Sequence, residues 1–149
     1  GSAWSGGDVW KDEELVTTLT KWVHEGGCFI GVNEPSAVEG YDTYFRMAHV
    51  LGIDEDTGAR VCHGKWAFEV ADPERLIPEG AGVEAKENRY LTDGKAQVLL
   101  ADDEKPLITL NQFGKGLGIY LSESVEYQDV VPADPLCGRR RHFRQLYDR

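Results

Sequence analysis

The sequence is poor in the residues that mark disulfide-rich or membrane-spanning proteins. Its 149 residues include three cysteines, a small and odd number that argues against a disulfide framework and favours a reducing compartment. No apolar run approaches the roughly 20 residues that a membrane span requires. Residues 1–8 are polar and glycine-rich, unlike a signal peptide. We therefore predict a cytoplasmic protein with no membrane contact.

Basic residues are scarce relative to acidic ones. Lysine and arginine number 16 against 26 aspartates and glutamates, which gives a formal net charge of −10. The basic residues are also unevenly placed, because five arginines lie between Cys137 and the end of the chain. An acidic body repels phosphates, so we predict no nucleic-acid partner and no anionic membrane surface. The simplest interpretation of the many acids is a solvated surface.

The clearest local pattern predicts a helix that begins after Asp12 and ends before two glycines. Asp12 is a favourable N-cap residue, and Gly26 and Gly27 suit a helix end. Four apolar residues recur at helical spacing and are expected to face the core: Leu15, Leu19, Trp22 and Val23. Val16 flanks this face.

A short apolar run at residues 28–32 follows the helix. Its length and its flanking residues predict a strand buried on both faces, as in a parallel sheet. The run stops at Asn33, Glu34 and Pro35. Open α/β sheets bind ligands at the carboxyl ends of their parallel strands. Asn33 and Glu34 are therefore candidate ligand or domain-interface residues, and the alternative is that they only satisfy the local backbone.

The remaining elements follow from the same patterns. We expect a helix over residues 36–52, a strand within 61–69 and a loop over 72–80. Strands are predicted at 96–101, 106–113 and 117–122, the last two forming a hairpin around Gly114-Lys115-Gly116. The opening helix lacks a preceding strand, which we expect upstream. The domain is expected to span residues 1–124, and residues 125–149, rich in proline and arginine, to form a weakly ordered tail.

Three short patterns resemble ligand sites without completing one. Residues 54–58 resemble the start of a calcium loop but lack its later ligands. Cys62 and His63 are adjacent without a second ligand pair, so a surface pair is favoured over zinc. Residues 114–118 are glycine-rich but precede a strand instead of opening a helix, so they do not suit phosphate. The sequence therefore predicts no catalytic residue, no metal and no cofactor.

The unit of helix, glycines, strand and turn resembles the flavodoxin-like fold of class I glutamine amidotransferases. That family presents a nucleophilic cysteine at the turn, where this sequence has Asn33. An amide forms no thiolate and cannot attack a carbonyl. No histidine that could activate a nucleophile occurs between His63 and His142. The resemblance implies the fold without the amidotransferase activity.

A more specific resemblance rests on four blocks in the same order, at residues 3–8, 26–36, 44–53 and 113–122. They look like the central domain of the lacto-N-biose phosphorylase family. In that family a TIM-like barrel with the catalytic acid precedes this domain, and a small β domain follows it. The family cleaves β-galactosides with phosphate and inversion, giving α-galactose 1-phosphate and a free sugar. Residues 125–149 depart from the family pattern, which continues into a closing helix.

The resemblance implies an α/β, flavodoxin-like fold with a mostly parallel sheet and a late β-hairpin, similar also to the trimerisation domain of certain β-galactosidases. It implies a non-catalytic central domain of a galactoside phosphorylase. The barrel domain and the C-terminal β domain of the parent chain are the expected partners, together with a second copy of the parent in a homo-oligomer. Two alternatives are an oligomerisation module of another glycosidase, such as a β-galactosidase, and a stand-alone sugar-binding domain. The acceptor sugar is not implied.

Overall fold

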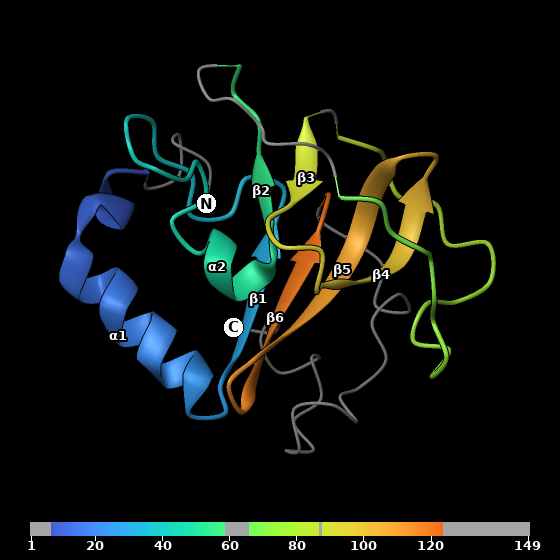
Figure 1. Ribbon diagram of the computed structural model, residues 1–149, viewed down its shortest axis with the longest axis horizontal. Helices are drawn as coiled ribbons and strands as arrows, with labels where there is room; N and C mark the ends of the chain where they lie inside the picture. The colour runs from blue at the N-terminus through green and yellow to red at the C-terminus, as the bar shows by residue number, and fades with distance from the viewer. Residues whose placement is uncertain (1–6, 59–65, 87, 124–149) are drawn as a thin grey trace, which may run out of the picture.

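The computed structural model describes residues 7–58, 66–86 and 88–123 (Figure 1). The first part of the chain forms the 3-10 helix η1 (Gly7–Lys11), the helix α1 (Glu13–His24), the strand β1 (Cys28–Val32), the short helix α2 (Ala48–Leu51) and the strand β2 (Ile53–Glu55). The second part forms the strands β3 (Arg89–Leu91), β4 (Gln97–Asp102), β5 (Lys105–Phe113) and β6 (Gly116–Leu121). In the described ranges no helix has both the length and the apolar character needed to cross a membrane.

The strands form a four-stranded mixed sheet and a separate two-stranded sheet. The larger sheet has the order β1-β6-β5-β4, and the smaller pairs β2 with β3. Within the larger sheet, β1 and β6 are parallel, whereas β4 with β5 and β5 with β6 form antiparallel pairs. The predicted flavodoxin-like fold with a mostly parallel sheet is therefore wrong. Short turns join β4, β5 and β6, and such turns produce antiparallel pairs, while parallel pairs need long crossovers.

The late strands and their hairpin agree with the prediction. β5 and β6 are in register from Ile108 with Leu121 to Phe113 with Gly116. The turn between them consists of Gly114 and Lys115, with Gly114 in the left-handed region at a φ of 59°. Glycine reaches that conformation without the clash that a Cβ would cause. The hairpin signal in the sequence was therefore sufficient to locate this element.

The opening helix forms as predicted, but it is rotated from the predicted orientation. Asp12 caps it by accepting hydrogen bonds from the backbone N–H groups of Glu14 and Leu15. Val16 and Val23 are the buried residues, and Trp22 is 50% exposed, so the prediction of Trp22 as core is wrong. The Trp22 indole lies against the main chain of Gly27, where an added Cβ would come within 2.5 Å of the ring.

The predicted helix over residues 36–52 is reduced to the four residues of α2. Two side chains capture the backbone donors that a longer helix would use. The Ser36 hydroxyl accepts from the Met47 N–H at 3.0 Å, and the Asp54 carboxylate accepts from the Phe45 N–H at 2.8 Å. Side-chain acceptors of this kind compete with helix formation. Gly52 ends α2 in the left-handed conformation, as its type predicts.

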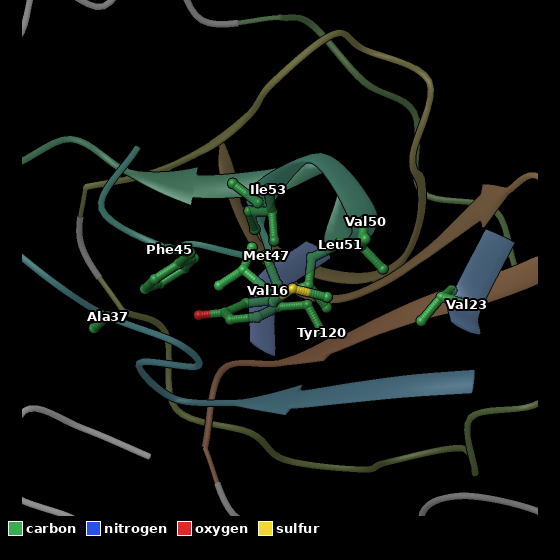
Figure 2. Packing of buried hydrophobic residues seen from close by; sticks show 10 residues of the cluster. Val16, Val23, Ala37, Phe45, Met47, Val50, Leu51, Ile53 and Tyr120 are labelled. Carbon is green, nitrogen blue, oxygen red and sulfur yellow. The ribbon is translucent and has the colours of Figure 1, made fainter. Parts of the chain in front are cut away.

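The core lies on both faces of the sheet. On one face, Tyr120 of β6 packs with Phe45, Met47, Leu51 and Ile53 beneath α2 and β2 (Figure 2). On the other face, Leu121 and Ile108 pack with apolar side chains of the irregular segment 76–85. β1 lies at the edge of the sheet, and four of its five residues are only half-buried, so the predicted burial on both faces is not observed.

Several predictions concern residues outside the described ranges. The tail over residues 125–149, the pair Cys62 and His63, and most of the strand predicted within 61–69 belong to this group. Residues 66–69 are described and form no strand. The loop predicted over 72–80 is confirmed.

Candidate functional site

The turn after β1 holds the two candidate residues Asn33 and Glu34. The Asn33 N–H donates to the carbonyl of Leu121 at 2.9 Å, which extends the pairing of β1 with β6 by one residue. Asn33 then turns the chain at a φ of 59°, an uncommon conformation that asparagine tolerates better than most residues. Asn33 is exposed and Glu34 is half-buried. The turn therefore lies at the carboxyl end of the strand, where the sequence placed it.

Arg89 and Tyr120 hold the main chain at this turn. Arg89 Nη2 donates to the Asn33 carbonyl at 3.3 Å, and the Tyr120 hydroxyl donates to the same oxygen at 3.4 Å. Arg89 Nε also donates to the Tyr120 hydroxyl at 2.9 Å. The guanidinium carbon lies 5.1 Å from the centroid of the Phe45 ring. These contacts join β3, β6 and the end of β1.

Glu55, at the end of β2, supplies the carboxylate that balances Arg89. Arg89 Nη1 and Glu55 Oε2 are 2.5 Å apart, and the two side chains are 4% and 18% exposed. Burial raises the pKa of Glu55, and the nearby Glu34 adds to this rise, while the charge of Arg89 opposes it. The ion pair thus lies in a poorly solvated place, where removal of one partner is costly.

The pKa values of two tyrosines beside the pair are raised, so both hydroxyls keep their protons at neutral pH. Burial raises the pKa of Tyr120, and the charges of Glu55 and Glu34 raise it further, against the opposing effect of Arg89. The pKa of Tyr44 is raised by burial first, and then by Glu34, Glu55 and Glu39. We call Asn33, Glu34, Glu55, Arg89 and Tyr120 the elbow cluster.

Asp54, the residue before Glu55 in β2, binds backbone groups next to the cluster. It is fully buried, and its carboxylate accepts from the backbone N–H groups of Tyr44, Phe45 and Glu55 at 2.8–3.2 Å. These bonds attach the segment before α2 to β2. Residues 54 and 55, which in the sequence resemble the start of a calcium loop, both belong to β2 in the structure. Their oxygens hold protein groups in place.

The sequence analysis identified Asn33 and Glu34 but missed Glu55, Arg89 and Tyr120. Arg89 lies 31 residues from Tyr120 and 56 from Asn33 in the chain, so no local spacing relates them. The sequence offered no local signal for Arg89 either, because its strand, Arg89–Leu91, has three residues and buries a charged side chain.

The cluster is suited to fixing the backbone. It contains a guanidinium, a phenol and carboxylates, and the guanidinium and the phenol both contact acceptors of this chain. The described histidines His24 and His49 instead contact the ring of Phe113, with ring centroids 5.7 Å away in each case. In the part of the chain that the structure describes, the cluster thus contains no nucleophile beside a histidine base, which covalent catalysis by serine or cysteine would need.

Comparison with known protein families gives a match over residues 1–130 to the model described as "Lacto-N-biose phosphorylase central domain". The chain is 53% identical over 122 residues to a D-galactosyl-beta-1->4-L-rhamnose phosphorylase of Lachnoclostridium phytofermentans, covering 82% of this chain and 17% of that protein. It is 28% identical over 158 residues to a 1,3-beta-galactosyl-N-acetylhexosamine phosphorylase of Bifidobacterium longum, covering 81% of this chain and 21% of that protein. The chain thus spans about a fifth or less of the length of these relatives.

Among solved structures, the chain is similar to a β-galactosidase from Bacillus circulans. The match has a TM-score of 0.44 and 18% identity, and it covers 73% of this chain and 18% of that one. A similarity at this level defines neither the fold nor the function. The family match favours the phosphorylase prediction over the alternative of a module from another glycosidase.

Proposed function

Because the chain belongs to the lacto-N-biose phosphorylase family, as its central domain, we propose that it is a non-catalytic part of a galactoside phosphorylase. The parent enzyme converts a β-galactoside and phosphate into α-galactose 1-phosphate and a free sugar. The relatives' names share a galactosyl group and differ in the acceptor, which is rhamnose in one and N-acetylhexosamine in another. The galactosyl donor is therefore the common part of the proposal.

The arrangement of the elbow cluster is the observation that supports a non-catalytic role. Arg89 and Tyr120 direct their polar atoms onto the Asn33 carbonyl and onto each other. A substrate site would present a guanidinium or a hydroxyl to the ligand, in an orientation suited to the transition state. Here these groups hold a turn in a fixed conformation. The turn then presents Asn33 and Glu34 to a neighbouring domain.

Six of the described lysines and arginines also support this role. Phosphorolysis requires an acid to protonate the leaving oxygen and positive charge to hold phosphate. Within residues 7–58, 66–86 and 88–123, ion pairs with carboxylates involve the following side chains: Lys11, Lys21, Arg46, Lys86, Arg89 and Lys95. Each such pair offsets the positive charge that a phosphate would need.

The proposed partners are the barrel domain that precedes this domain in the parent and the small β domain that follows it. The half-buried Glu34 and the exposed Asn33 form the contact surface of the turn. Interfaces between domains of one chain typically bury about 600–1,500 Å² and are more polar than obligate interfaces. A second copy of the parent is a further proposed partner.

The proposal is tested by Glu34→Ala in this chain and in the parent enzyme. In this chain the change should be neutral or slightly stabilising, because it removes a negative charge that acts on Glu55. In the parent it should lower the melting temperature, because a domain contact is lost. Glu79→Ala, at an exposed loop position, is the matched control. It should change the free energy of unfolding of neither protein by more than about 0.5 kcal/mol. The same small change in both proteins would show that the turn contacts no other domain.

A further inference from the structure

An exposed tryptophan lies beside a small hollow between three segments that are distant in the sequence. Trp66 is 53% exposed and begins the described range 66–86. The hollow is lined by this segment, by Tyr90 of β3, and by Glu104 and Pro106 at the turn from β4 to β5. β3 lies beside β5, which brings the three segments together (Figure 1). Two aromatic rings and a carboxylate therefore surround one small hollow.

One face of the Trp66 indole packs on the main chain. A Cβ added at Gly94 would lie 3.0–3.4 Å from three contiguous ring atoms, Cε3, Cδ2 and Cγ. Contact with several contiguous atoms means that the flat face of the ring, and not its edge, covers the glycine. Because more than half of the side chain is still exposed, the opposite face is turned to solvent. An indole held in this way offers a surface for a second flat, apolar group.

The polar groups of the hollow disfavour a charged ligand. Glu104 is exposed at its rim, so an anion such as phosphate would meet a carboxylate. Arg89 also lines the hollow, so a cation would meet a positive charge. A hydroxyl group suits the carboxylate, which accepts an O–H in a charge-assisted hydrogen bond. The hollow has room for about one water-sized group, so it fits a hydroxyl group and not a ring.

We propose that this surface binds a galactopyranosyl ring, with the ring stacked on the solvent face of Trp66 and one hydroxyl group in the hollow, donating to Glu104. A neutral hexopyranose combines C–H groups that pack on an aromatic ring with hydroxyl groups that bond to a carboxylate. Galactose differs from glucose in one axial hydroxyl group, which leaves three adjacent C–H groups on one face of the ring. The choice of galactose rests on the proposed function, whereas the choice of a neutral hexopyranose rests on the hollow and the indole.

Titration of this chain with methyl β-D-galactopyranoside, followed by NMR, tests the proposal. Each tryptophan contributes one indole N–H signal, so Trp66 and Trp22 report separately in the same spectrum. Trp22 is the internal control, because it is 50% exposed and packs on Gly27 in the same way but is not among the residues that line the hollow. The Trp66 signal should shift with a dissociation constant of about 1 mM, as expected for a ligand of this size, while the Trp22 signal stays unchanged. Methyl β-D-glucopyranoside should bind at least about threefold more weakly, because less apolar area is covered.

Two variants separate the stacking from the hydrogen bond. Trp66→Ala should abolish binding of the galactoside, and Trp22→Ala should leave it unchanged. Glu104→Gln should weaken binding about fivefold to tenfold, because a charge-assisted hydrogen bond is roughly twice as strong as a neutral one. Glu79→Gln, at an exposed loop position, is the matched control for this change. Glu104 is exposed in a turn, so its variant keeps the test valid even where Trp66→Ala disturbs the fold.

Three results would overturn the proposal. A Trp66 signal that does not move throughout the titration would show that the indole holds no sugar. Equal binding of the galactoside and the glucoside would remove the assignment to galactose. A Trp66 signal that moves with tetramethylammonium and not with the galactoside would show a cation site. The titration contains no phosphate and measures no turnover, so none of these results bears on whether the domain is non-catalytic, which the Glu34 variants and activity measurements address.

Discussion

Arg89 connects three parts of the molecule that are distant in the sequence. It contacts Glu55 in β2, Tyr120 in β6 and the Asn33 carbonyl after β1. A buried guanidinium is stable only when its charge and its donors meet partners. Arg89 therefore fixes the turn, the small sheet and the large sheet relative to one another. Variants of its partners Tyr120 and Glu55 measure how much these contacts contribute to the free energy of unfolding.

Tyr120→Phe should destabilise the folded chain by about 1–3 kcal/mol, because it leaves a buried Arg89 donor without its acceptor. The side chain is fully buried, so no water replaces the lost hydroxyl directly. Urea unfolding of the two proteins gives the difference. Tyr41→Phe is the matched control, since the Tyr41 hydroxyl makes an exposed 3.4 Å contact with the Lys11 carbonyl. Equal effects of the two changes would contradict the role assigned to Tyr120.

Glu55 should make the stability depend on pH in the direction opposite to that of a typical paired carboxylate. Burial raises its folded-state pKa above the usual value of 4.5, so the folded protein binds this proton more tightly than the unfolded chain does. Its contribution to stability therefore increases as the pH falls through the folded pKa toward 4.5, and it is lost as the pH rises.

Glu55→Gln removes this titration. Urea unfolding of both proteins between about pH 7 and pH 4.5 should show the wild type gaining stability relative to the variant as the pH falls. The difference between the two proteins is the relevant quantity, because the other carboxylates titrate in both. A difference that is constant with pH, or that changes in the opposite direction, would contradict the raised pKa.

At the scale of elements, α2 packs against β6 through a glycine. A Cβ at Gly118 would lie 2.1 Å from the carbonyl oxygen of Val50, a main-chain atom that cannot move without moving α2. Gly118→Ala should therefore destabilise the chain by at least about 1–3 kcal/mol, the range found for overpacked cores. Gly82→Ala is the control, because nothing lies within 4 Å of the added carbon there. Thermal unfolding compares the two, and similar melting temperatures would show that α2 is not held closely.

The elements that the sequence predicted well are those with local signals. α1 has an N-cap and terminal glycines, and β4, β5 and β6 are apolar runs bounded by turn residues. The rotation of α1 was missed because Trp22 fits the periodicity of the helix yet packs on the main chain of Gly27. The helix predicted over residues 36–52 failed because Ser36 and Asp54 capture its donors. Neither effect can be predicted from the spacing of apolar residues.

The topology could not be predicted from local signals either. Cys28 pairs with Leu117, far along the chain, so β1 lies beside β6 and not beside a strand near it in sequence. The resemblance to flavodoxin-like folds rested on residues 12–36, which form one helix and one strand in either architecture. The family assignment depended on four blocks spread along the chain and was correct.

At the scale of the whole molecule, the chain is an acidic domain within a much longer enzyme family. Its net charge is −10, and it covers 17–21% of the relatives named above. The proposed contribution of this domain is to hold other parts of the enzyme in position. Its acidic character disfavours phosphate binding by itself, because phosphate is repelled by a negative field. The central claim is therefore that chemistry takes place in another domain of the parent.

The most direct test is to incubate the purified chain with a β-1,3-galactoside and inorganic phosphate and to measure galactose 1-phosphate, with the full-length parent as the positive control. We predict no product above the buffer blank from this chain, and loss of activity in a parent from which residues 7–123 are deleted. Formation of galactose 1-phosphate by the chain alone would contradict the proposed non-catalytic role.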